Sequence, residues 1–204
     1  MNKKFTIISV IVFMALNTIA SEGSKYWTKK NESEIKVGEK ERWIIPKQYE
    51  TYTIDLNYFK SIISRAPHNS VIDVKDSKVI IDLPLPNGDI GQFKIVENTT
   101  MSKELAMQFP EIKAYSGISL HDKTATLKLD ITPKGIHAMI LSANHSTLFI
   151  DPYANFDNEN YIIYYKNDFK TSKLMDCEVS LNIENDIKTA NKSAIGDCQL
   201  RTYR

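Results

Sequence analysis

The sequence is poor in the residues that most catalytic and cofactor-binding motifs require. Its 204 residues include only 7 glycines, and none lies in a glycine-rich run that could cradle a phosphate. No Gly-x-Ser-x-Gly motif occurs, and none of the four histidines is followed by another histidine four residues later. The signatures of a serine hydrolase and of a helical zinc site are therefore both missing. We expect this chain to contain neither a catalytic set nor a cofactor of its own.

An excess of charge of one sign is also missing. The chain has 26 basic and 25 acidic residues, and loss of residues 1–20 would remove Lys3 and Lys4 and leave 24 basic residues against 25 acidic ones. Lysines alternate with acids, as in residues 36–42, whereas nucleic-acid binding normally needs a clustered basic field. We therefore expect no nucleic-acid partner.

Cysteine is scarce and confined to the end of the chain. The two cysteines, Cys177 and Cys198, fall within the last thirty residues. A disulfide between them could close only a terminal loop, so hydrophobic burial must hold the rest of the chain together.

Only one long hydrophobic run is present, and it lies at the start of the chain. Residues 5–16 are apolar, follow Lys3 and Lys4, and precede a polar, small-residue stretch that ends at Ala20. This is the layout of a secretory signal. A membrane anchor is the alternative, but the run is shorter than the ~20 residues that span a bilayer. We predict cleavage after Ala20, a secreted or periplasmic protein, and no stable membrane insertion afterwards.

The remaining sequence predicts an α+β fold that is predominantly antiparallel β, meander-like or sandwich-like, with two short helices and a disordered C-terminal arm. Helices are indicated from Leu56 behind an Asp55 cap, and over 103–108 behind a Ser102 cap. Alternating or β-branched runs predict strands over 49–54, 70–74, 78–83, 90–96, 125–131, 136–141, 147–150 and 161–165. The expected organisation is a signal peptide (1–20), a flexible entry segment (21–45), a β-rich domain (46–167), a linker or arm (168–198) and a final stretch (199–204).

The histidines lie in four different segments, and a surface or turn role is the simpler interpretation of each: His68, His121, His137 and His145. His137 is the most notable, because it lies in a predicted strand whose neighbours Ile136 and Ala138 face the other way. We expect it to be a packed strand histidine.

Two aspartates also invite a catalytic interpretation. Asp151 and Asp157 flank Pro152-Tyr153 and could form an acid/base pair. Turn formation explains them more simply, because Asp-Pro and Asn-rich stretches end strands without any catalytic role.

Several stretches, in order along the chain, resemble the pro-regions of secreted reprolysin-like (adamalysin-like) zinc metalloproteases of bacteria. They are residues 81–88 (IDLPLPNG), 93–97 (FKIVE), 101–106 (MSKELA), 109–117 (FPEIKAYSG), 131–139 (ITPKGIHAM) and 149–153 (FIDPY). The similarity runs from about Trp43 to Arg204. Residues 199–204 are included, because a similar Leu-Arg-Thr-Tyr-Arg opens the first strand of the catalytic domain in that family.

The resemblance implies a propeptide that is cut off before its catalytic domain. Such a domain would assist the folding of the protease and keep it latent, would itself be non-catalytic, and would have as partner a metalloprotease catalytic domain, normally in the same chain, that carries the zinc. For latency, Cys198 or, less readily, Cys177 could ligate that zinc as a thiolate. A Cys177–Cys198 disulfide is the alternative that an oxidising compartment favours.

Two other functions stay open at this point. A free-standing exported binding module could present Tyr161, Tyr164 and Tyr165 to a glycan or a peptide, because aromatic side chains make good binding surfaces. A novel exported enzyme is the third option, although no residue pattern recommends it.

Overall fold

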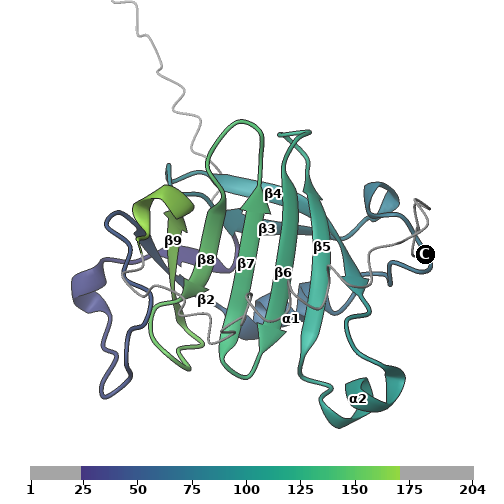
Figure 1. The fold of residues 1–204 in the computed structure, drawn as a ribbon, viewed down its shortest axis with the longest axis horizontal. Helices are drawn as coiled ribbons and strands as arrows, with labels where there is room; N and C mark the ends of the chain where they lie inside the picture. The colour runs from purple at the N-terminus through teal and green to yellow at the C-terminus, as the bar shows by residue number, and fades with distance from the viewer. Residues whose placement is uncertain (1–23, 171–204) are drawn as a thin grey trace, which may run out of the picture. The chain divides into compact units, whose positions relative to one another are not determined.

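The structure is a computed structural model that describes residues 24–170 (Figure 1). The predicted signal and its cleavage site at Ala20 lie outside the described residues, as do Cys177, Cys198 and residues 199–204. None of the helices within 24–170 is long and apolar enough to cross a bilayer.

Nine strands of the described chain form one antiparallel sheet in the order β1-β2-β9-β8-β7-β6-β5-β4-β3. Their bounds are β1 (Trp27–Lys29), β2 (Glu50–Ile54), β3 (Ile80–Pro84), β4 (Ile90–Asn98), β5 (Lys113–Ser119), β6 (Thr126–Thr132), β7 (Gly135–Leu141), β8 (Leu148–Pro152) and β9 (Asn160–Tyr165). Strands β3 to β9 form a meander, and the β1–β2 hairpin joins it through antiparallel pairing of β2 with β9. The predicted predominance of antiparallel β structure is confirmed.

Two short helices accompany the sheet, at the predicted places. Helix α1 (Leu56–Ile63) begins behind Asp55, whose carboxylate accepts a backbone N–H of the first turn at 3.0 Å. Helix α2 (Lys103–Gln108) begins behind Ser102, whose hydroxyl accepts a backbone N–H at 3.3 Å. Helix α1 buries Phe59 and Ile63 in the core, whereas α2 buries no side chain and extends away from the sheet (Figure 1). Three 3₁₀ turns complete the fold: η1 (Glu32–Glu34), η2 (Val74–Asp76) and η3 (Lys166–Asp168).

The sheet curls until its two edge strands approach, so that it is nearly barrel-like. The backbone carbonyl of Asp82 on β3 accepts hydrogen bonds from the Tyr26 hydroxyl at 3.2 Å and from the Trp27 indole N–H at 3.0 Å. The Asp82 N–H in turn donates to the Tyr26 hydroxyl. Two buried aromatic side chains at the start of β1, Tyr26 and Trp27, thus satisfy the backbone of an edge strand that would otherwise be open to another chain.

The core lies on the concave face of the sheet. On β6 the side chains of Leu127, Leu129 and Ile131 are buried, whereas those between them point outward, as the alternation predicts. Phe59 and Ile63 of α1 pack into the same cluster. A second, smaller apolar cluster forms on the outer face around β9, where the segment before β2 covers the sheet.

Three sequence predictions differ from the structure. The entry segment 21–45 was predicted to be flexible, yet it contains β1 and buries Tyr26 and Trp27. Residues 70–74 were predicted as a strand, but they form a turn that leads into η2, and Val71 is 81% exposed. The Asp73 side chain caps η2 by accepting the Lys75 N–H, which favours a turn over a strand. Strand β5 was not predicted.

Candidate protein-interaction site

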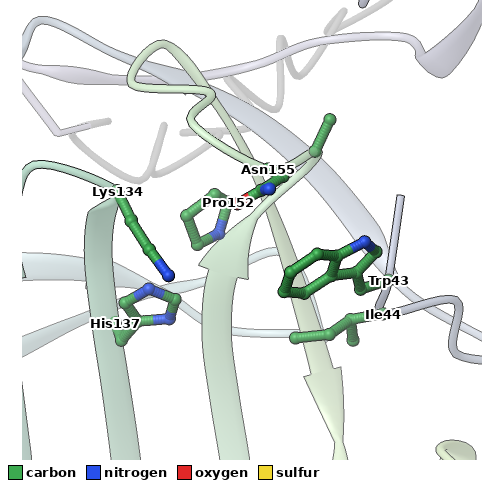
Figure 2. A pocket seen from close by; sticks show the side chains of 7 residues that line it. Trp43, Ile44, Lys134, His137, Pro152 and Asn155 are labelled. Atoms are coloured by element: carbon green, nitrogen blue, oxygen red, sulfur yellow. The ribbon is translucent and has the colours of Figure 1, made fainter. Parts of the chain in front are cut away.

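A small pocket opens on the outer face of the sheet, next to the β6–β7 turn (Figure 2). Its volume is about 130 Å³, and its lining residues are Trp43, Ile44, Lys134, His137, Pro152, Ala154 and Asn155. Sites for small organic ligands usually measure roughly 300–1,000 Å³. The pocket therefore suits a single side chain of another polypeptide better than a free small molecule.

The β6–β7 hairpin places two of the lining residues. Thr132 pairs with Gly135 across a two-residue turn that contains Pro133 and Lys134. Gly135 has a φ of 123°, and a Cβ there would lie only 2.6 Å from Pro152 Cγ. Because Gly135 has no side chain, the turn packs directly against the end of β8, which brings Lys134 to the pocket rim.

His137 belongs to a polar row that crosses the outer face of four strands. Asp130 on β6 is its cross-strand partner, and Asp151 on β8 lies on its other side, with Nδ1 and Oδ1 2.7 Å apart. The second carboxylate oxygen of Asp151 accepts the Tyr164 hydroxyl of β9 at 2.8 Å. Asp151 is only 8% exposed, so this row is a satisfied polar network within an otherwise apolar region.

The network sets the charge of the pocket. The hydrogen bond to Asp151 raises the pKa of His137 above its ordinary value, against the opposing effect of burial, and the Asp130 carboxylate also raises it. Burial raises the pKa of Asp130, and burial together with Asp151 raises the pKa of Tyr164 far above its usual range. His137 therefore keeps its proton to a higher pH than an isolated imidazole.

Trp43 is presented to solvent by a segment that is itself well anchored. Its indole is 65% exposed. The preceding residue, Arg42, stacks over the Tyr153 ring at 4.0 Å from the ring centroid and bonds Glu32 at 2.9 Å. The following residue, Ile44, packs into the apolar cluster around β9. A large exposed aromatic side chain held between two anchored neighbours is typical of a contact residue.

The Glu32 carboxylate that Arg42 contacts is also held by two tyrosine hydroxyl groups. Tyr153 and Tyr49 both donate to Glu32 Oε1, and these bonds lower the pKa of Glu32. Burial and the Glu32 carboxylate raise the pKa of Tyr153 to about 12. The hydrogen bonds from Tyr49 and Tyr153 to Glu32 are consequently kept across the physiological pH range.

The structure separates the two aspartates that the sequence suggested as a pair. Asp157 accepts the backbone N–H groups of Glu159 at 3.0 Å and Asn160 at 3.1 Å, so it caps the turn before β9 as predicted. Asp151 lies within β8 and is bonded to His137 and Tyr164, so the prediction of a turn role is wrong for this residue. His137 lies on strand β7 as the sequence predicts, but its side chain is 37% exposed and lines the pocket, so it is only partly packed.

The other three histidines lie away from the pocket. His68 bonds Ser70 and Thr99 in a turn. His121 and His145 line one hollow of about 330 Å³ at the opposite end of the β6–β7 hairpin. The hollow also contains Asp122, whose carboxylate accepts the hydroxyls of Thr124 in the same turn and Ser142 in the next one. Within residues 24–170, no three His, Cys, Asp or Glu side chains are grouped so that they could hold a metal ion.

The tyrosines suggested as a ligand platform do not form one. Tyr161 is fully buried on the concave face, and Tyr164 is 4% exposed on the outer face beneath Phe169 and Phe149. Only Tyr165 is partly exposed. Sequence reasoning placed the aromatic surface at β9, whereas the exposed aromatic residue of the pocket is Trp43, an isolated tryptophan in a polar stretch.

Comparisons with protein-family models, curated proteins and solved structures gave no significant match for this chain. Fold and site together define a single-sheet β domain with a pocket of side-chain size on its outer face. The resemblance to metalloprotease pro-regions is carried by the sequence stretches alone.

Proposed function

We propose that this chain is the pro-region of an exported zinc metalloendopeptidase precursor, which assists the folding of the catalytic domain and keeps it latent. In this proposal the chain supplies a docking surface, and the zinc belongs to the partner. Catalysis is performed by the partner alone.

The observation that carries the proposal is where the similar stretches meet. Two of them, 131–139 and 149–153, are separated by nine residues and lie on the paired strands β7 and β8, and they provide Lys134, His137 and Pro152 to the same pocket. The pocket has the volume of one side chain, and two of its lining residues, His137 of β7 and Pro152 of β8, lie on neighbouring strands of the sheet. Well-packed pockets and large aromatic side chains are where protein–protein binding energy concentrates.

The test is inhibition in trans. The purified 204-residue chain is added to the mature catalytic domain of an exported His-Glu-x-x-His metalloprotease from the same organism, and hydrolysis of a fluorogenic casein is measured. We expect inhibition that weakens by about 30-fold in Trp43→Ala, the usual effect of truncating a hot-spot residue. Val71→Ala is the control, because Val71 is apolar, 81% exposed and lies in the turn after His68, which bridges Glu97 of β4, whereas the strand residues of the pocket are on β7 and β8.

The same experiment separates this function from that of a free-standing binding module. Absence of inhibition at a large molar excess of the chain would reject the pro-region role. Equal loss of inhibition in Trp43→Ala and Val71→Ala would reject the pocket as the docking site.

A further inference from the structure

The pocket has two chemically different sides (Figure 2). Trp43, Ile44 and Pro152 form an apolar side, and Lys134 and His137 form the other. In Figure 2 the Lys134 side chain points toward the His137 ring, so both nitrogen-bearing groups lie at one rim.

The Lys134 ammonium group is available to a ligand. Its Nζ lies 5.8 Å from the centroid of the exposed Phe156 ring, and no carboxylate among residues 24–170 pairs with it within 4.0 Å. Lysine has a compact, strongly hydrated charge on a flexible stem, so it can reach an incoming carboxylate with little cost.

The His137 ring has one nitrogen left for a ligand. Nδ1 is bonded to Asp151, so Nε2 is the remaining donor when the ring is protonated. The charged or titratable groups around His137 are Asp130 on β6, Asp151 on β8, Tyr164 on β9 and Lys134 in the turn. Neither carboxylate lines the pocket, and Asp151 already accepts two hydrogen bonds. The rim that faces a ligand is therefore cationic.

We infer that the pocket binds an apolar side chain whose neighbour in the partner polypeptide is an aspartate or a glutamate. The apolar side chain fills the space beside Trp43, and the carboxylate accepts from Lys134 Nζ and His137 Nε2–H. This inference rests on the proposed function only for the identity of the partner, because the recognition chemistry follows from the pocket itself.

Binding of this kind depends on pH. The raised pKa of His137 keeps the second donor present at and somewhat above the ordinary histidine pKa of about 6.5. Affinity for a carboxylate consequently increases as the pH falls through the pKa of His137 and decreases above it.

The test is an NMR titration of the full chain with two capped peptides, acetyl-Gly-Leu-Asp-Gly-amide and its Asn counterpart. The chain has two indole N–H signals, one from buried Trp27 and one from exposed Trp43. We expect the Trp43 signal alone to shift, with the Asp peptide binding about threefold to tenfold more tightly than the Asn peptide at about pH 5.5. The preference should shrink as the pH rises through the pKa of His137, because the neutral ring has no second N–H donor.

Lys134→Gln should remove most of the preference for the Asp peptide. Lys123→Gln is the matched control, because it removes the same charge at the β5–β6 turn, at the other end of β6. Equal binding of the two peptides, an unchanged preference in Lys134→Gln, or no shift of the Trp43 signal would each overturn the inference.

Failure of the inference differs from failure of the proposed function. If Trp43→Ala abolishes protease inhibition but Lys134→Gln does not, the pro-region role stands and the carboxylate preference is wrong. If the peptides bind as expected while no protease is inhibited, the pocket chemistry stands and the pro-region role is wrong.

Discussion

Gly135 determines how closely the β6–β7 turn approaches Pro152. Its φ of 123° disfavours any L side chain, and a Cβ would lie 2.6 Å from Pro152 Cγ. The conformation and the contact both exclude alanine, so a small change at this residue should distort one wall of the pocket.

We predict that Gly135→Ala lowers the free energy of unfolding by about 1–3 kcal/mol and weakens docking at the pocket. Gly88→Ala is the matched control, because Gly88 also has a positive φ of 89° but a Cβ added there would meet no atom within 4 Å. It should cost about 1 kcal/mol, from backbone strain alone. Urea denaturation measures both, and equal losses would show that the contact with Pro152 contributes nothing.

At the scale of residues, the sequence could predict which way a side chain points from a strand, but not which residue it bonds. The alternation around His137 correctly predicts that the imidazole faces away from the core. Its bond to Asp151 depends on the pairing of β7 with β8, which links residues 14 positions apart. The exposed position of Trp43 likewise depends on how the segment before β2 folds over the outer face, and no local pattern encodes that.

At the scale of elements, the contact between the two edge strands is made by side chains. Tyr26 both donates to and accepts from the Asp82 backbone on β3, and burial raises its pKa well above the usual range. Removal of this hydroxyl leaves a backbone N–H without its acceptor in a largely buried place.

We predict that Tyr26→Phe lowers the free energy of unfolding by about 1–3 kcal/mol and speeds amide hydrogen exchange at Asp82. Tyr58→Phe is the control, because Tyr58 stacks near Tyr26 but is 43% exposed. If the Asp82 amide exchanges its hydrogen at the same rate in both variants, the role given to the Tyr26 hydroxyl is contradicted.

The elements that sequence predicted well carry their own start signals or a clear alternation. Asp55 and Ser102 cap the two helices at the predicted residues, and β6 alternates strictly. Strand β5 was not recognised in the sequence because its buried face consists largely of Tyr115 and Gly117. A Cβ on Gly117 would lie 2.9 Å from the Lys94 carbonyl oxygen of β4, so close strand packing replaces the apolar side chain that reveals a strand.

At the scale of the described domain, the fold class was predictable from the sequence, but the curling of the sheet that brings β1 close to β3 was not. Seven strands follow one another as a meander, which local patterns and turns indicate. The pairing of β2 with β9 and the approach of β1 to β3 join distant parts of the chain, and the three-residue β1 gives too short a pattern to be recognised.

The export predictions can be checked with one measurement on the protein secreted by an expression host. We predict an intact mass for a chain that begins at Ser21 and has two hydrogen atoms fewer than the reduced form, because an oxidising compartment favours the Cys177–Cys198 disulfide. A mass that retains residues 1–20 would contradict the cleavage after Ala20. A mass with two free thiols would contradict the disulfide. If zinc then protects Cys198 from labelling in the full precursor, the hypothesis that Cys198 is a zinc ligand in the latent protease would be favoured.

The pairing of β2 with β9 also determines the order in which the domain can assemble as it leaves the ribosome. The hairpins from β3 to β8 can form one after another as they emerge, since each strand pairs with its neighbour in sequence. The β1–β2 hairpin emerges first, yet its place in the sheet exists only after residues 160–165 have been made. If the chain is exported from its N-terminus, β1 and β2 therefore remain unpaired with the sheet until β9 has emerged. Such long-range pairing is slow to form.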